Sequence, residues 1–163
     1  MPHYVFVPVA TTISTDVTLA PLTGRPRTLE EYLTTFHLAV VALDPFTQQG
    51  SWILPIATRV LTHFSQADVR VALLLPATPD ECRLFLGPLV NTLLAFSDPN
   101  SEAIKGMGFE RLPVFAHIAM DGTLEGKAEG WQPAEWQAVA DQLAEVMSWT
   151  STVVERDGDP APF

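Results

Sequence analysis

The chain has 163 residues, of which 47% are hydrophobic, and its formal net charge at pH 7 is −10. This length fits a single domain that can bury a sizeable core. The nine Lys and Arg residues are scattered without a basic patch, which argues against nucleic acid or an anionic membrane as a partner. One cysteine, Cys82, excludes an intramolecular disulfide and a cysteine-based zinc site.

The N-terminal stretch MPHYVFVPVATT lacks the basic flank and the long apolar core of a signal peptide. No run approaches the roughly 18 apolar residues of a membrane span, so the expected location is cytoplasmic. Residues 4–10 alternate weakly and are compatible with an edge strand. We divide the chain into an N-terminal edge segment (1–21), a main domain (22–149) and an acidic, weakly ordered tail (150–163).

The first part of the main domain contains a turn, a short helix and a buried strand. Gly24-Arg25-Pro26 is typical of a turn, and Thr28 followed by Glu31 is a capping-box signature that predicts a short helix. Residues 37–43 form a near-continuous apolar run, which predicts a strand buried on both faces.

A polar turn and a helix follow this strand. Asp44-Pro45 interrupts the apolar run, and Thr47-Gln48-Gln49-Gly50 forms a short polar turn. From Ser51 onward apolar residues recur at helical spacing, so a helix is predicted there. Pro55 lies inside this pattern, where proline removes a hydrogen bond and kinks the helix.

The remainder alternates between strands and helices and ends in a hairpin plus a helix. The predicted elements are a strand at 68–75, a helix at 79–86 capped by Thr78, an apolar run at 90–96, a brief helix after Ser101, a strand at 114–120, an Asp121-Gly122 turn, a strand at 123–128 and an amphipathic helix from Pro133 to Met147. This order indicates an α/β domain with a mixed central sheet.

A buried strand, a tight loop and a proline-kinked helix resemble the active-site unit of thioredoxin-like proteins. There the loop carries Cys-x-x-Cys, and a proline lies five residues beyond the second cysteine. Pro55 lies five residues beyond Gly50, so Thr47 and Gly50 stand at the two cysteine positions. The segment from Gly108 to Met147 is similar to the end of thioredoxins, and Pro113 falls on their cis-proline.

The resemblance covers roughly residues 22 to 147 and is closest to the TlpA-like and peroxiredoxin branch. It implies a thioredoxin-like three-layer α/β/α sandwich with a mixed central sheet and a C-terminal β-hairpin plus helix. In thioredoxins a buried acid lies six residues before the first cysteine, and here that position is Val41. Because thiol–disulfide exchange needs a thiolate, we expect dithiol chemistry to be absent and no cofactor to be bound.

Cys82 admits two interpretations. Asp80 and Glu81 beside it disfavour a thiolate, and the apolar face of its helix favours a half-buried structural cysteine. Its place early in that helix instead favours the anion. The alternative function is therefore a single-cysteine redox or peroxidase-like protein that uses Cys82 and an external thiol.

The four histidines are His3, His37, His63 and His117, and their spacings match no metal-binding motif. His37 and His117 would be neighbours if their predicted strands pair, which leaves a two-histidine metal site as an alternative. The expectation is structural histidines with satisfied hydrogen bonds and no metal.

In the thioredoxin family the residue before the first cysteine, the cis-proline loop and the turn after the hairpin line a groove for extended peptide, a form of strand addition. The corresponding residues here are Phe46, Thr47, Gln48, Gln49, Gly50, Trp52, Leu112, Pro113, Gly130 and Trp131. Aromatic residues at a groove rim suit protein recognition; alternatively, Trp52 and Trp131 cover the edge of the core.

The preferred hypothesis is a redox-inactive protein that binds another protein or peptide through this groove, as a chaperone, an assembly factor or a complex subunit. Some hydrogenase-maturation chaperones are similar in being thioredoxin-like without the cysteine pair. A structural homodimer, formed through an apolar helix or an edge strand, is a further alternative.

Overall fold

The computed structural model describes residues 11–163. The edge strand predicted at residues 4–10 and the histidine at position 3 lie outside this range. The strands are β1 (Thr11–Thr12), β2 (Thr18–Pro21), β3 (Arg27–Thr28), β4 (His37–Ala42), β5 (Val69–Leu75), β6 (Leu94–Ser97), β7 (Val114–Ile118) and β8 (Thr123–Glu129). The helices are α1 (Leu29–Leu33), α2 (Gln48–Phe64), α3 (Pro79–Leu86), the 3₁₀ helix η1 (Gly87–Asn91), α4 (Glu102–Gly106) and α5 (Pro133–Met147).

The strands form one mixed sheet in the order β1-β8-β7-β4-β5-β6-β2-β3. β4 lies in its centre, parallel to β5 and antiparallel to β7, and β7 continues into the antiparallel hairpin with β8. The predicted mixed sheet with a C-terminal hairpin and helix is therefore confirmed.

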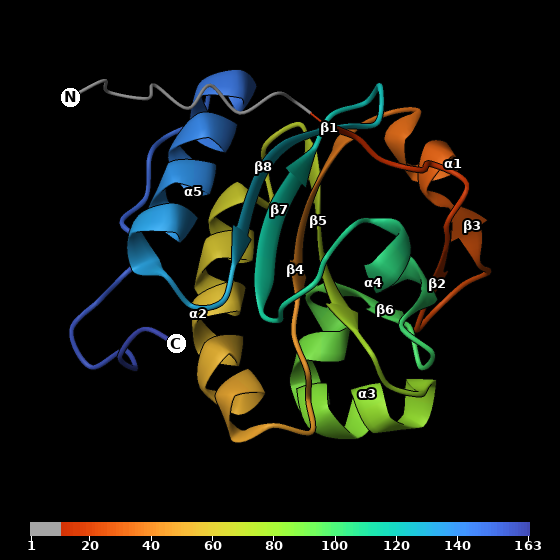
Figure 1. Cartoon of the computed structure of the whole chain (residues 1–163), viewed down its shortest axis with the longest axis horizontal. Coiled ribbons are helices and arrows are strands. Elements are labelled where there is room, and N and C mark those ends of the chain that lie inside the picture. Colours follow the sequence, from red (N-terminus) through yellow and green to blue (C-terminus); the bar gives the residue numbers. More distant parts are fainter. Residues whose placement is uncertain (1–10) are drawn as a thin grey trace, which may run out of the picture.

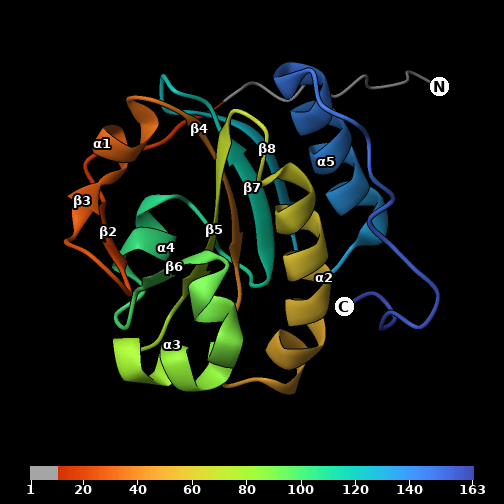
Figure 2. The same ribbon diagram turned by 180° about the vertical axis from the view of Figure 1, so that it is seen from behind.

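Helices cover both faces of the sheet (Figures 1 and 2). Because side chains alternate along a strand, β4 presents Leu38 and Val40 to one face and Ala39 and Val41 to the other. The first pair lies in a core with α1 and α4, and the second lies in a core with α2, α3 and α5. This arrangement is the expected three-layer sandwich.

The helix α2 begins three residues earlier than the apolar pattern predicts. Thr47 is its N-cap, and the Thr47 hydroxyl oxygen accepts a hydrogen bond from the Gly50 N–H at 3.0 Å. The same hydroxyl donates to the Asp44 carbonyl oxygen at 3.1 Å. These bonds draw the loop after β4 onto the first turn of α2, so the predicted polar turn becomes part of the helix.

Gly50 sits against the backbone of this loop. A Cβ atom added at Gly50 would lie 1.8 Å from the Asp44 carbonyl oxygen, a separation that real atoms do not reach. The close approach of the loop to α2 therefore requires glycine at this position.

The apolar run at residues 90–96 does not form one element. Residues 87–91 form η1 and residues 94–97 form β6. Gly87 adopts a positive φ of 55°, and Pro88 follows it, so the chain turns here before entering the sheet.

The segment after α5 contains no helix or strand, but specific contacts hold it against the rest of the chain. Val154 is buried, and its N–H donates to the Gln137 side chain at 3.0 Å. Figures 1 and 2 both show the C-terminal end beside α2. The sequence of this tail predicts weak order, because its apolar residues show no periodicity. A single buried residue such as Val154 produces no periodic pattern and is therefore not predicted.

Two histidines, one on β4 and one on β7, contact each other in the sheet. His37 Nδ1 and His117 Nε2 are 2.8 Å apart, and His117 Nδ1 lies 2.8 Å from the Gln142 side-chain oxygen on α5. The predicted proximity of His37 and His117 is thus confirmed. His117 is buried, and this burial lowers its imidazole pKa; the Gln142 contact opposes that shift, and His37 adds to it.

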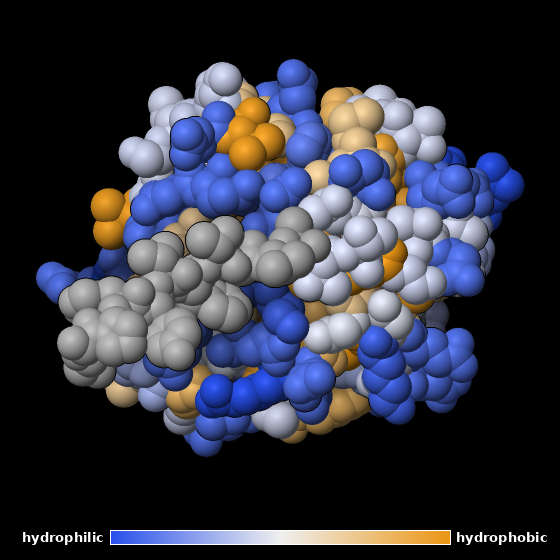
Figure 3. Space-filling view, turned by 45° about the horizontal axis from the view of Figure 1, so that its top comes forward, coloured by the Kyte–Doolittle hydropathy of each residue, from blue (hydrophilic) through white to orange (hydrophobic). Residues whose placement is uncertain are grey.

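The end of the molecule opposite the β4–α2 loop is turned forward in Figure 3. Apart from the grey atoms, this face is mostly hydrophilic, and its hydrophobic residues lie in separate small groups. Among residues 11–163, none of the helices combines the length and the apolar character needed to cross a membrane.

We expect Gly50→Ala to lower the free energy of unfolding by roughly 2 kcal/mol, because the new methyl group overpacks the Asp44 carbonyl. Helix propensity alone would give the opposite sign, a gain of up to about 1 kcal/mol. Denaturant unfolding measures the difference. Gly126→Ala is the matched control, since its Cβ would lie 3.5 Å from Val139, an ordinary contact. A more stable Gly50→Ala protein would contradict the close approach.

We expect the protein to lose stability as the pH falls below about 6.5, where an unfolded histidine takes up a proton. In the folded chain, burial lowers the pKa of His117, so protonation favours the unfolded state. The contribution of neutral His117 to the free energy of unfolding is therefore complete above about pH 6.5, and it is lost as the pH falls toward the lower pKa of the folded state. Unfolding midpoints between about pH 7.5 and 5 measure it. His117→Gln should flatten this dependence, whereas His63→Gln should retain it; equal slopes for wild type and His117→Gln would contradict the assignment.

Candidate functional site

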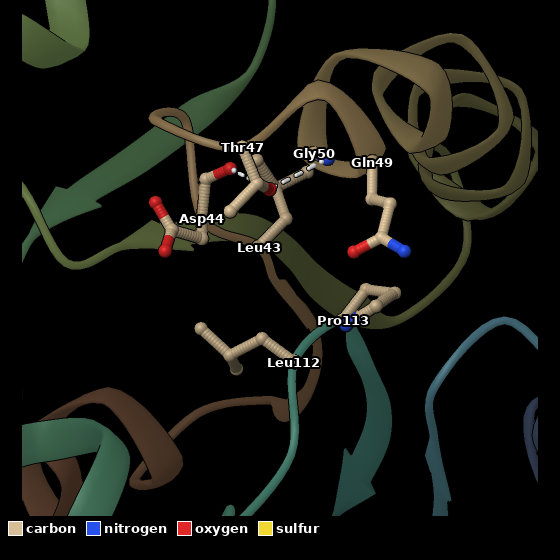
Figure 4. Close-up of a pocket in the computed structure, with 7 residues that line it drawn as sticks. All are labelled: Leu43, Asp44, Thr47, Gln49, Gly50, Leu112 and Pro113. Carbon is tan, nitrogen blue, oxygen red and sulfur yellow. Dashed lines mark hydrogen bonds between the residues drawn. The ribbon is translucent and has the colours of Figure 1, made fainter. Parts of the chain in front are cut away.

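Two segments far apart in the sequence meet at a cavity of about 300 Å³ (Figure 4). One segment is the loop after β4 with the first turn of α2, and the other leads into β7. The lining residues are Leu43, Asp44, Thr47, Gln49, Gly50, Leu112 and Pro113. The structure therefore brings together five of the predicted groove residues, and it places Pro113 across the cavity from Thr47 and Gly50.

The loop after β4 is fixed by its own hydrogen bonds. The Phe46 N–H donates to the Asp44 carboxylate at 2.9 Å, and the Thr47 hydroxyl donates to the Asp44 carbonyl. Thr47 is therefore occupied as a helix cap. Because Gly50 has no room for a Cβ atom, a second cysteine could not stand here unless the loop moved.

The loop before β7 ends in a cis Leu112–Pro113 peptide bond. Glu129 on β8 holds this loop: its carboxylate accepts the N–H of Arg111 at 2.8 Å and that of Glu110 at 3.3 Å. Lys127 lies 2.8 Å from the other carboxylate oxygen. Burial alone would raise the pKa of Glu129, but the hydrogen bonds from Lys127 and from the two backbone N–H groups together lower it.

Leu112 keeps its backbone hydrogen-bonding groups free. Within residues 11–163, neither its N–H nor its C=O takes part in the hydrogen bonds of the loops and turns. The Pro113 carbonyl, in contrast, accepts the Gly130 N–H at 2.7 Å, so Gly130 lies directly behind the proline. Leu112 thus offers a donor and an acceptor at the cavity edge, which an added strand requires.

The predicted rim residues differ in exposure. Phe46 is 64% exposed and Trp52 is 45% exposed, and Gln48 is exposed on the first turn of α2. None of these three residues lines the cavity at Pro113. Trp131 is fully buried, and its indole N–H donates to the Pro160 carbonyl at 2.9 Å. Of the two interpretations of the tryptophans, covering the core edge fits Trp131, whereas Trp52 is partly exposed and contacts the Phe163 ring.

Cys82 lies away from this cavity, on α3, within the core that α3 shares with α2 and α5. Burial raises the pKa of its thiol, and a hydrogen-bonding contact with Ser97 opposes that shift in part. Its sulfur lies 3.7 Å from the Ala77 carbonyl oxygen. The half-buried cysteine of the sequence-based interpretation is fully buried in the structure.

Sequence reasoning did not identify Leu43, Asp44 and Glu129 as parts of the site. Asp44 carried a detectable signal, since an Asp followed by Pro directly after a buried strand often caps the next turn. Glu129 carried none, because its contacts with residues 110 and 111 depend on the pairing of two distant loops. Within the described part of the chain, no cluster of three or more His, Cys, Asp or Glu residues could hold a metal ion.

Comparison with known proteins gives the fold. No protein-family profile matches the sequence, and no curated protein matches it significantly. Among solved structures, the chain is similar to the exposed lipoprotein thioredoxin Etrx1 of Streptococcus pneumoniae (17% identity, TM-score 0.62, 80% of this chain and 98% of that one).

Two proteins of Mycobacterium tuberculosis are similar as well. One is the peroxidoxin BcpB (14% identity, TM-score 0.65, covering 85% of this chain and 95% of that one). The other is a secreted disulfide oxidoreductase homologous to E. coli DsbE (15% identity, TM-score 0.59, covering 82% and 96%). The chain thus has the thioredoxin-like fold of DsbE-, TlpA- and peroxiredoxin-type proteins, without a Cys-x-x-Cys motif.

Proposed function

We propose that the chain is a redox-inactive thioredoxin-like protein that binds another polypeptide through the groove between the start of α2 and the loop before β7. Such a protein would act as a chaperone, an assembly factor or a subunit of a complex. The observation that carries the proposal is the cavity itself, in which Thr47 and Gly50 face Pro113 at the positions where thioredoxins hold two thiols.

The chemistry of the cavity supports binding rather than electron transfer. Thr47 is a helix cap without an adjacent base, and Gly50 has no side chain, so neither supplies a nucleophile. The free N–H and C=O of Leu112 could pair with an extended backbone, and the exposed Phe46 ring, in the loop between Asp44 and Thr47, could contact its side chains. These features suit a peptide ligand.

The alternative, a single-cysteine redox protein, depends on Cys82. A reactive thiol needs access to solvent and a lowered pKa. Cys82 has neither, because it is buried and its burial raises the pKa. The structure therefore favours the binding proposal over this alternative.

We expect Phe46→Ser to weaken peptide binding by about tenfold, since removing an aromatic anchor costs on the order of 1–2 kcal/mol. A displayed library of unstructured peptides selects ligands for the wild-type chain, and titration then compares the variants. Leu84→Ser is the matched control, because Leu84 is also exposed (88%) but lies on α3, whereas Phe46 lies in the loop between Asp44 and Thr47, which line the cavity. Equal losses in both variants, or no ligand for the wild type, would contradict the proposal.

We expect Cys82 in the native chain to react with iodoacetamide at least about tenfold more slowly than in the unfolded chain, because the buried thiol ionises reluctantly. Mass spectrometry of the alkylated chain follows both rates. The wild-type chain and Cys82→Ala should be equally inactive in insulin reduction and in peroxide reduction with an external thiol. Rapid native labelling, or turnover that Cys82→Ala abolishes, would favour the redox alternative.

A further inference from the structure

Residues 159–163 form no helix or strand and lie against the turn before α5. The Trp131 N–H donates to the Phe163 carbonyl at 2.7 Å, and the Phe163 N–H donates to the Trp131 carbonyl at 3.0 Å. This reciprocal pair is the bonding pattern of two antiparallel strands. A Cβ atom added at Gly130 would lie 2.8 Å from the Phe163 carbonyl oxygen, so the glycine before Trp131 leaves room for the segment.

Three side-chain contacts fix the same segment. The Asp159 carboxylate accepts two hydrogen bonds from the Arg59 guanidinium on α2, at 2.7 and 3.2 Å. The Pro160 carbonyl accepts the Trp131 indole N–H. The Phe163 ring lies edge-on to the Trp52 ring, with centroids 6.3 Å apart. The surface therefore contacts a carboxylate, a backbone carbonyl and an aromatic ring within five consecutive residues.

The segment and the start of α2 line a common hollow. A cavity of about 810 Å³ lies between the first turns of α2 and residues 158–163. Its lining from α2 consists of Gln49, Ser51, Trp52, Pro55 and Ile56. Gln49 also lines the cavity at Pro113, so the two hollows are neighbours on either side of the start of α2. Within this segment Phe163 packs against the edge of the core, whereas Gly158, Ala161 and Pro162 are exposed.

The sequence of the segment suits a ligand. Pro160 and Pro162 restrict the backbone and favour an extended conformation, which lowers the entropy lost on binding. The anchors Asp159 and Phe163 stand four positions apart in this segment. Their counterparts Arg59 and Trp52 both belong to α2, so the rigid helix sets the spacing that the surface recognises.

We propose that the surface formed by Trp52, Arg59 and Trp131 is a recognition site for an extended Asp-Pro-x-Pro-aromatic peptide, which the chain's own residues 159–163 occupy in cis. A partner polypeptide that carries this pattern binds by displacing the tail. The inference deepens the proposed function by naming the chemistry of the partner at the groove rim, and it rests on that function only for the biological role of the exchange.

The test uses the full chain with the two anchors removed, Asp159→Asn together with Phe163→Ala. The probe is the synthetic peptide Gly-Asp-Pro-Ala-Pro-Phe with both ends blocked, and calorimetric titration measures its affinity. A tethered ligand competes at an effective concentration of about a millimolar. We therefore expect saturable one-to-one binding to the double variant, at least about tenfold tighter than to the wild type.

Two controls separate the contacts from general effects. The double variant Val153→Ala with Asp157→Asn changes exposed tail residues outside the three contacts and should bind the probe as weakly as the wild type. A probe with Asn for Asp and Ala for Phe should bind at least about tenfold more weakly to the anchor-free chain. Equal affinity of the anchor-free chain and the wild type, or of both probes, would overturn the proposal.

Hydrogen exchange on the wild-type chain gives a second measurement that does not depend on the folding of a variant. If the tail is a reversible ligand, the Trp131 amide should exchange at least about tenfold faster than the amides of β4, through local opening. Equal protection would show that the tail opens only with the whole fold and would overturn the proposal. Neither test uses ligands of the Pro113 cavity, so the peptide-library experiment can fail or succeed independently.

Discussion

The contact between Gly50 and the Asp44 carbonyl is the constraint on which the site depends. It brings the end of the central strand β4 against the first turn of α2, and Thr47 secures the approach by bonding both partners. The chain shares its fold with a secreted disulfide oxidoreductase, and here the Asp44 carbonyl fills the space that a side chain at position 50 would need. The chain has no Cys-x-x-Cys motif, and the packing at Gly50 leaves no room for a cysteine side chain at that position.

The opposite wall of the cavity, the loop before β7, is held by hydrogen bonds with β8 and the turn that follows it. Glu129 gathers two backbone N–H groups of the loop before Pro113, and Gly130 donates to the Pro113 carbonyl. β8 and its following turn therefore position the proline loop, while Leu112 is left with free backbone groups. A polar clamp of this kind fixes the wall without using the groups that a peptide ligand would need. The cavity is pre-formed on both sides.

The sequence predicts the parts of this site that local pattern determines. The apolar run of β4, the proline inside α2 and the Gly-Phe…Pro segment before β7 identify the two walls before any coordinates are considered. The Thr47 cap moves the start of α2 to Gln48, before the first apolar residue of the pattern. Apolar periodicity does not reveal this start, because N-cap residues are polar. The contacts of Glu129 and the burial of Trp131 depend on segments that meet only in the folded chain. The contacts of residues 151–163 are likewise not predictable from the sequence, because single buried or hydrogen-bonded residues produce no periodic pattern.

Trp131 is one of the predicted groove residues and also forms hydrogen bonds with residues 160 and 163. Its side chain is fully buried, so it contacts Pro160 and Phe163 through its indole N–H and its backbone rather than through an exposed ring. The groups that it offers are directional donors and an acceptor, and they are met by the tail in the present structure. A surface that recognises backbone in this way discriminates mainly through neighbouring side chains. Arg59 and Trp52 on α2 supply such side-chain contacts to Asp159 and Phe163, so the helix that begins at the Pro113 cavity also holds residues 159–163.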